Sequence, residues 1–295
     1  MSLYEIHERV DLDAPLLIMA LEGWIDAGAG AARATTALTE QLDSVLLASF
    51  DTDSLLDHRA RRPVMELVDG VNTNLVWPTI ELRAASDGAG NDVLLLIGAE
   101  PDHSWRAFSS AAVDLALAYG TRLVLGLGAY PAPVPHTRPT MLSSTATTPE
   151  LARLVGTTGV NVSVPAGVQA AIERQCAEVG LPAMGLWAQV PHYAAAMPYP
   201  AAAAALLDGL GDLGGLTLDS QDLHDEAVAT RVRLDGLVAE SDEHEELVAQ
   251  LEAHIDAQLR GEPLPDAASD DRPLEIASGD ELAAELERFL REQGG

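Results

Sequence analysis

The sequence GLGAYPAPVPHTRP at residues 126–139 decides the fold of this chain, and it follows an apolar run from Thr121 to Leu127. An apolar run this short, ending in glycines, predicts a buried strand rather than a free-standing helix. Four prolines within residues 131–139 restrict the backbone and remove four N–H donors. They predict a rigid loop that is neither a helix nor a central strand.

This loop carries His136 and Arg138 close together. Because it leaves the carboxyl end of a strand, it is expected where open α/β sheets place their ligands. The alternative interpretation is a turn in which the two side chains bond backbone carbonyls.

The same order of strand, polar loop and helix occurs earlier in the chain. An apolar run at residues 15–21 leads into a glycine-rich turn and a helical pattern that continues to about residue 42. Asp26 in this turn is expected to cap the helix, because a helix N-terminus favours a carboxylate. The turn lacks the third glycine of a dinucleotide site, since Arg33 stands at that position.

Polar residues also follow two further predicted strands, at residues 44–50 and 92–97. The first leads to a basic patch at residues 57–63 that includes Arg59 and Arg62, which either receives an anion or is paired with the chain's own acids. The second leads to Asp102, which acts at a cleft or caps the helix predicted over residues 104–119. Residues 75–84 read as one further strand.

A second Val-Pro-His sequence, at residues 190–192, follows a strand predicted over residues 185–190 and is continued by Tyr193. We expect it to face the first such loop across the edge of the sheet, which would pair His192 with His136. The shared sequence covers three residues, so it does not indicate a duplication.

The domain organisation follows from composition. The sequence predicts an α/β core domain over residues 1–215 and a helical hairpin over 216–260, with Gly236 and the acids from Glu240 to Glu246 dividing the two helices. An acidic, proline-containing linker is predicted at 261–277 and a terminal amphipathic helix at 278–295. No apolar stretch is long enough to cross a membrane, and the first ten residues lack a signal-peptide core, so a cytoplasmic protein is expected. The single Cys176 is expected to be a core thiol.

The charge excludes several classes of partner. The 46 acidic residues exceed the 17 basic ones, for a net charge of −29. Such a chain repels nucleic acid and an anionic membrane, so neither is expected as a partner. All the basic residues are arginines, which excludes a P-loop lysine and a Schiff-base lysine.

Catalytic and metal signatures are missing as well. The sequence has no zinc-protease, paired-cysteine or nucleophile-elbow motif, and the histidines lack metal-ligand spacing, so no cofactor and no metal are expected. A triad of His136, Ser143 and Asp102 can be assembled on paper, as it can in any chain of this size.

Four motifs together resemble the proteasome assembly chaperone 2 family, most closely its bacterial branch in actinobacteria. The resemblance covers about residues 16–210 and is carried by GWIDAG (23–28), DHRARRP (57–63), VPHTRP (134–139) and WAQVPHY (187–193). It implies a three-layer α/β/α fold with a mixed, mostly parallel sheet, similar to purine nucleoside phosphorylases and related hydrolases. Relatives in this family help to assemble proteasome α-rings, often through a C-terminal hydrophobic-Tyr-any tail. This sequence ends REQGG, without that tail.

Three hypotheses follow. The first is a non-enzymatic binding or assembly protein that forms a homo-oligomer and acts on proteasome subunits. The second is a protein or enzyme that binds an anionic small molecule, such as a phosphate or a nucleoside, at the sheet edge. The third is a structural oligomer whose loops are buried in subunit contacts. The candidate binding residues are Asp26, Arg59, Arg62, Asp102, His136, Arg138, His192 and Tyr193.

Overall fold

The computed structural model describes residues 3–23, 25–156, 161 and 163–260. The chain divides into two compact units, Met1–Glu252 and Ala253–Gly295. The predicted linker at 261–277 and the terminal helix at 278–295 lie outside the described residues. The first unit holds the sheets, their covering helices and α7.

The centre of the first unit is an eight-stranded mixed sheet in the order β1-β3-β6-β7-β2-β8-β10-β9. β7, β2, β8 and β10 pair in parallel, and β3 points the same way because two antiparallel pairings separate it from β7. The carboxyl ends of these five strands therefore meet at one edge of the sheet, which we call the carboxyl rim. The bounds of the strands are β1 Tyr4–Ile6, β2 Leu16–Glu22, β3 Val45–Phe50, β6 Ile80–Ser86, β7 Asp92–Ala99, β8 Leu123–Ala132, β9 Leu142–Ala146 and β10 Ala183–Pro191.

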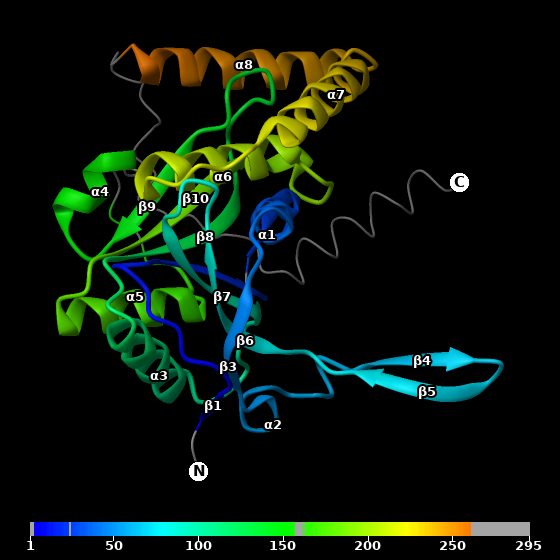
Figure 1. The fold of residues 1–295 in the computed structure, drawn as a ribbon. Coiled ribbons are helices and arrows are strands. Elements are labelled where there is room, and N and C mark those ends of the chain that lie inside the picture. Colours follow the sequence, from blue (N-terminus) through cyan, green and yellow to red (C-terminus); the bar gives the residue numbers. More distant parts are fainter. Residues whose placement is uncertain (1–2, 24, 157–160, 162, 261–295) are drawn as a thin grey trace. The chain divides into compact units, whose positions relative to one another are not determined.

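Helices cover both faces of this sheet (Figure 1). Side chains of β2 alternate between two hydrophobic cores, as the pleat requires: Leu16 and Ile18 face one, and Leu17 and Met19 face the other. The first core is completed by α1 (Gly30–Gln41), α6 (Pro200–Gly214) and α7 (Gln221–Val238), and the second by α3 (Trp105–Ala118) and α5 (Val168–Val179). The predicted three-layer α/β/α architecture is confirmed.

Most predicted helices are present close to their expected bounds. The segment after residue 219 forms two helices, α7 and α8 (Asp242–Leu259), and they are separated at residues 239–241, so Gly236 lies inside α7. Two shorter helices complete the set, α2 (Thr52–Leu55) and α4 (Pro149–Val155). Within the described part of the chain, no helix has the length and apolar character needed to cross a bilayer.

The prediction that the prolines of residues 131–139 exclude a central strand was wrong for Pro131. β8 extends to Ala132 and pairs with β10 throughout. Its pairing with β2 ends at Gly126, so Pro131 lies where the β2 side of β8 has no continuous ladder. A proline is tolerated there, because the missing N–H removes no hydrogen bond of a ladder on that side.

The single strand predicted over residues 75–84 was also wrong. These residues belong to two strands of different sheets, β5 (Val71–Val76) and β6. β5 pairs with β4 (Val64–Val68) in a separate two-stranded sheet, drawn in cyan in Figure 1. Asp69 and Gly70 connect the two strands with positive φ angles of 50° and 80°, as a tight hairpin turn requires.

Candidate functional site

All eight candidate residues follow strands whose carboxyl ends form the carboxyl rim. Asp26 follows β2, Asp102 follows β7, and Arg59 and Arg62 come after β3. His136 and Arg138 follow β8, whereas His192 and Tyr193 follow β10. Because β8 and β10 are neighbours, and β3 and β7 lie on the other side of β2, the candidates form two separate clusters.

The first cluster is built around His136, which is buried. The hydroxyl of Tyr193 accepts a hydrogen bond from the backbone N–H of His136 at 2.8 Å and lies 2.7 Å from Nδ1 of the same residue. Since the hydroxyl has one proton to give, it donates to Nδ1, and Nε2–H donates to Asp235 of α7 at 3.1 Å. Burial raises the pKa of Tyr193 to about 12, although the bond from His136 opposes this, so the phenol stays neutral. His136 is therefore fully bonded within its own chain.

The residues after His136 also bind the C-terminal helices. Thr137 donates a hydrogen bond to Glu252 of α8, and Arg138 forms an ion pair with the same carboxylate at 3.0 Å. His192 is exposed, and its ring lies edge-on to Tyr193 with centroids 5.4 Å apart. The proline-rich loop is thus fastened to α7 and α8 by its polar side chains, and the ring of His136 bonds Tyr193 and Asp235 rather than His192.

Asp26 lies at the N-terminus of α1, between the two clusters. Its two carboxylate oxygens accept hydrogen bonds from the backbone N–H groups of Ala31 and Ala32 at 2.7 and 2.9 Å. Although the residue as a whole is exposed, partial desolvation of the carboxylate raises its pKa, and the bonds from the helix N-terminus act in the opposite direction. The predicted capping role is confirmed.

The second cluster is centred on Arg61, between the ends of β2 and β7. Its Nη1 donates to the backbone oxygen of Glu22 at 3.2 Å, and its Nε lies 3.5 Å from a carboxylate oxygen of Asp102. Asp102 also accepts the N–H of Asp57 at 2.8 Å, which holds the basic patch against the rim. Arg59 and Arg62, which flank Arg61 in the sequence, are exposed.

Glu100 completes the second cluster. It is buried and accepts the N–H of Val168, the first residue of α5, at 2.6 Å. Burial raises the pKa of Glu100, the Val168 bond and Arg61 lower it, and the neighbouring Asp102 raises it again. Gly23 leaves room for these side chains, because a Cβ there would lie 2.6 Å from Arg61 and 2.8 Å from Glu100.

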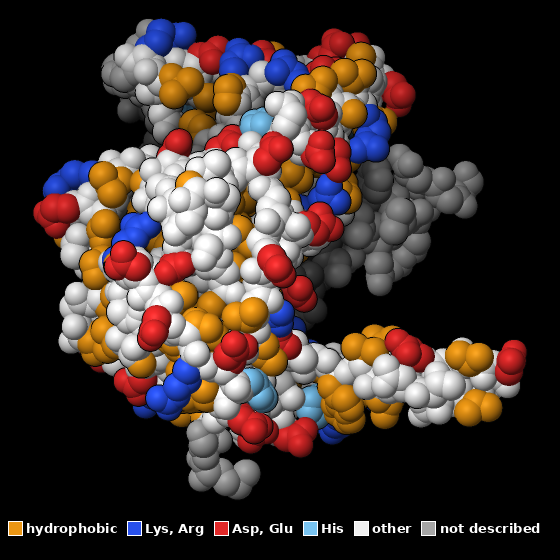
Figure 2. All heavy atoms as spheres, in the orientation of Figure 1, with side chains coloured by type: hydrophobic (Ala, Val, Ile, Leu, Met, Phe, Trp, Pro, Cys, Tyr) orange, Lys and Arg blue, Asp and Glu red, His pale blue; other side chains and the backbone are white. Residues whose placement is uncertain are grey.

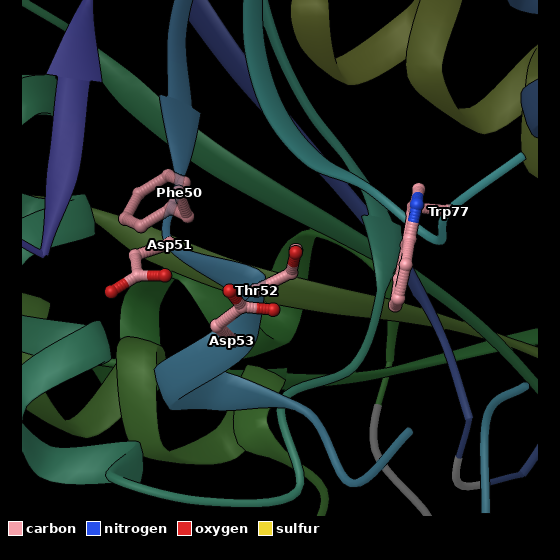
Figure 3. Close-up of a pocket in the computed structure, with 5 residues that line it drawn as sticks. All are labelled: Phe50, Asp51, Thr52, Asp53 and Trp77. Atoms are coloured by element: carbon pink, nitrogen blue, oxygen red, sulfur yellow. The ribbon is translucent and has the colours of Figure 1, made fainter. Parts of the chain in front are cut away.

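A concavity of about 410 Å³ lies further along the rim, between the end of β3 and the residue that follows β5 (Figure 3). Phe50, Asp51, Thr52 and Asp53 line one side, and Trp77 faces them from the other. His58 lies beside it, paired with Asp53 at 3.1 Å and edge-on to Trp77. None of the eight candidate residues lines this concavity.

The hypothetical triad of His136, Ser143 and Asp102 does not form. His136 bonds Tyr193 and Asp235, whereas Ser143 bonds the hydroxyl of Tyr130 at 3.2 Å and Asp102 pairs with Arg61. Among the described residues, no group of three or more His, Cys, Asp and Glu side chains could hold a metal ion.

The candidate set omitted four residues that hold the two clusters together: Arg61, Glu100, Asp235 and Glu252. Arg61 lies in a turn in which the Asp57 carboxylate accepts the N–H of Arg59 and the backbone oxygen of Asp57 accepts those of Ala60 and Arg61, and no pattern in the sequence separates Arg61 from its two neighbouring arginines. Asp235 and Glu252 follow His136 by about a hundred residues, and no local signal links them to it.

Comparison with known proteins identifies the family. The model of the PAC2 family matches residues 20–238, which is more than half of the chain. No curated protein matches the sequence significantly. Among solved structures, a Corynebacterium glutamicum protein of unknown function is 32% identical with a TM-score of 0.81, and the match covers 88% of this chain and 98% of that one.

Two further structures carry informative descriptions. A proteasome-assembly chaperone homologue from Mycobacterium tuberculosis is 32% identical with a TM-score of 0.73, and the match covers 79% of this chain and 99% of that one. A PAC2 family protein from Streptomyces avermitilis is 34% identical with a TM-score of 0.72, over 79% of this chain and 99% of that one. The resemblance seen in the four sequence motifs is thereby confirmed, and this chain belongs to the PAC2 family.

Proposed function

We propose that this chain is a non-enzymatic assembly protein of the cytosol that binds proteasome subunits and works as a homo-oligomer. The observation that carries the proposal is the similarity to the Mycobacterium tuberculosis proteasome-assembly chaperone homologue, because 99% of that protein is matched at 32% identity. The family model covers residues 20–238, which include all of the α/β/α core except β1 and the first part of β2.

The exposed members of the candidate set are the proposed contacts for the partner. Arg59, Arg62 and His192 present polar and basic groups to solvent along the carboxyl rim. Buried His136 and half-buried Tyr193 have a different role: they hold the proline-rich loop in place next to His192. Rigid loops of this kind favour protein binding, because little conformational entropy is lost when the partner docks.

The contacts of Arg61 and Arg138 count against a small anion bound at these two side chains. Arg61 lies against Asp102, and Arg138 is paired with Glu252. An incoming phosphate or nucleotide would have to displace these carboxylates and would also meet a chain of net charge −29.

The experiment is affinity purification of the tagged full-length chain from its native cells, followed by native mass spectrometry. We expect proteasome α-type subunits to be enriched with the bait. The double variant Arg59→Glu/Arg62→Glu should lower their recovery several-fold, because charge reversal at an interface slows association.

The matched control is Arg153→Glu/Arg174→Glu, which makes the same change of charge on the exposed faces of α4 and α5. Its recovery should equal that of the unsubstituted chain. Absence of proteasome subunits from a folded, intact bait would refute the proposed function. Equal loss in both double variants would refute the assignment of the contact to the rim.

A further inference from the structure

The concavity between the end of β3 and Trp77 has a lining that favours a positively charged ligand. The carboxylates of Asp51 and Asp53 and the hydroxyl of Thr52 supply hydrogen-bond acceptors, and none of the described residues that line it is basic. Trp77 supplies an indole ring and is 48% exposed. Figure 3 shows the Thr52 hydroxyl and the Asp53 carboxylate directed toward this ring, which is seen edge-on and so turns a face to them. A cation placed there can contact an aromatic face and a carboxylate at once.

Both carboxylates have acceptor capacity that the described chain leaves unused. Asp51 occupies the N-cap position of α2, but its side chain makes no capping hydrogen bond. One oxygen of Asp53 lies 3.1 Å from Nε2 of His58, and the Asp53 side chain is 88% exposed. Because an ionised carboxylate accepts about four hydrogen bonds, Asp53 can take further donors from a ligand.

His58 connects the two walls of the concavity. Its ring is bonded to Asp53 and lies edge-on to Trp77, with centroids 4.9 Å apart. Its Nδ1 is buried and has no hydrogen-bond partner among the described residues, so a proton there would be left without an acceptor. The neutral ring with its proton on Nε2 therefore fits this site, and the negative charge of Asp53 is not cancelled by His58.

The charge of the whole chain adds a long-range attraction for cations. The net charge is −29, and a chain of this charge raises the concentration of positive groups near its surface. On the face shown in Figure 2, acidic and histidine side chains lie together at the base of the β4–β5 hairpin. The volume of about 410 Å³ is within the range of about 300–1,000 Å³ that is usual for ligand sites.

Among the cations that proteins carry, a guanidinium suits this lining best. It is planar, it stacks on aromatic faces, and it can donate two parallel hydrogen bonds to one carboxylate. An ammonium is a compact and strongly hydrated point charge, so it uses the face of Trp77 and the oxygens of Asp53 less fully.

We propose that this concavity receives an arginine side chain of a partner protein, with the guanidinium between the ring of Trp77 and the carboxylate of Asp53 and with Thr52 accepting a further hydrogen bond. The inference deepens the proposed function and rests on it for the identity of the partner. Exposed ion pairs and cation–π contacts are individually weak, so a single free arginine should bind with a dissociation constant in the millimolar range.

The first test is a titration of the purified, ¹⁵N-labelled full-length chain with N-acetyl-arginine amide at constant ionic strength, followed by NMR of the indole N–H groups. The chain has four tryptophans, and Trp77→Phe identifies the signal of Trp77. We expect this signal to shift saturably. N-acetyl-citrulline amide has nearly the same shape without the charge, and it should leave the signal in place. Equal shifts with both compounds, or no shift up to about 50 mM arginine compound, would overturn the proposal.

The second test uses a pair of matched variants. Asp53→Asn removes the charge and keeps the size of the side chain, so it should weaken arginine binding several-fold. Asp114→Asn makes the same change at an exposed position of α3, and its affinity should equal that of the unsubstituted chain. Equal weakening in both variants would mean that net charge alone attracts the ligand, and it would overturn the site.

Affinity purification with Asp53→Asn as the bait separates this inference from the proposed function. Recovery of proteasome subunits should fall together with arginine binding. Unchanged recovery from a variant that no longer binds the arginine compound would overturn the assignment of the arginine to that partner. The NMR titration uses no proteasome subunit, so a chain that binds the arginine compound but recovers no subunits would refute the proposed function and leave the arginine site standing.

Discussion

Removing one hydroxyl, by Tyr193→Phe, should loosen the proline-rich loop measurably. The hydroxyl is the partner of both the backbone N–H and Nδ1 of His136, at 2.8 and 2.7 Å. His136 is 4% exposed, so water cannot easily replace either bond. Each buried group left unsatisfied costs about 1–3 kcal/mol, so the loss of both is expected to lower the free energy of unfolding by about 3 kcal/mol.

The substitution keeps the aromatic ring, so packing changes little and the effect is that of the hydroxyl alone. For a chain of this size, a loss of about 3 kcal/mol corresponds to roughly 10 °C in melting temperature. Urea unfolding followed by circular dichroism measures the change in free energy. Hydrogen exchange at the amide of His136 measures the free energy of local opening. This free energy should fall by a similar amount, so the exchange should become faster.

The control is Tyr119→Phe, since the hydroxyl of Tyr119 makes only a 3.5 Å bond to the backbone oxygen of Glu8. This variant should lose less than about 0.5 kcal/mol. If Tyr193→Phe behaves like the control, and exchange at His136 is unchanged, then the hydroxyl does not hold the loop and our reading of this cluster is wrong.

Three more predictions concern a turn, a strand end and a helix of the core. Burial alone would raise the pKa of Asp87, but hydrogen bonds from Asn91, Thr217 and Ala89 lower it to about 2. Because the pKa of Asp87 is lower in the folded chain than in the unfolded one, the ionised carboxylate stabilises the fold at pH values above the unfolded pKa. Asp87→Asn should therefore lower the free energy of unfolding by about 2 kcal/mol at pH 7. Urea titrations should show this difference between the two chains vanish as the pH falls from about 4 to about 2. Gly98→Ala should lower the melting temperature by more than about 10 °C, because φ is 118° and the Cβ would lie 2.1 Å from the Thr79 oxygen, whereas Gly88→Ala, in open space, should change it little; equal shifts would contradict this. Desolvation raises the pKa of Glu173, so its ionisation opposes folding, and Glu173→Gln should melt higher than the natural chain at pH 7, with an advantage that shrinks as pH falls; a constant difference would count against the mechanism.

Local patterns were sufficient for much of the architecture. The runs at residues 16–20 and 93–96 are apolar at consecutive positions, as in strands buried on both faces, and the structure buries them in two cores. The cap at Asp26 was readable because a carboxylate and the N–H groups that it bonds lie within six residues of each other. The Asp69-Gly70 turn was not predicted, although this pair of residues is a common hairpin signal, and part of β5 was assigned to the following strand.

The sequence by itself determined the parallel strands of the central sheet, the long helices, the family and the loops that follow each parallel strand, because each of these depends on residues that are near neighbours in the chain. Only the tertiary structure decided that Arg61 contacts Glu22 and Asp102 while Arg59 and Arg62 stay exposed. It also decided that His136 is buried and bonds Asp235 instead of lining an open cleft. These outcomes depend on which distant elements pack together, and their free energy comes from contacts between residues 39 to 99 positions apart. The exposure of the β4–β5 hairpin has the same origin, since an apolar hairpin is buried or exposed according to what the rest of the fold places beside it.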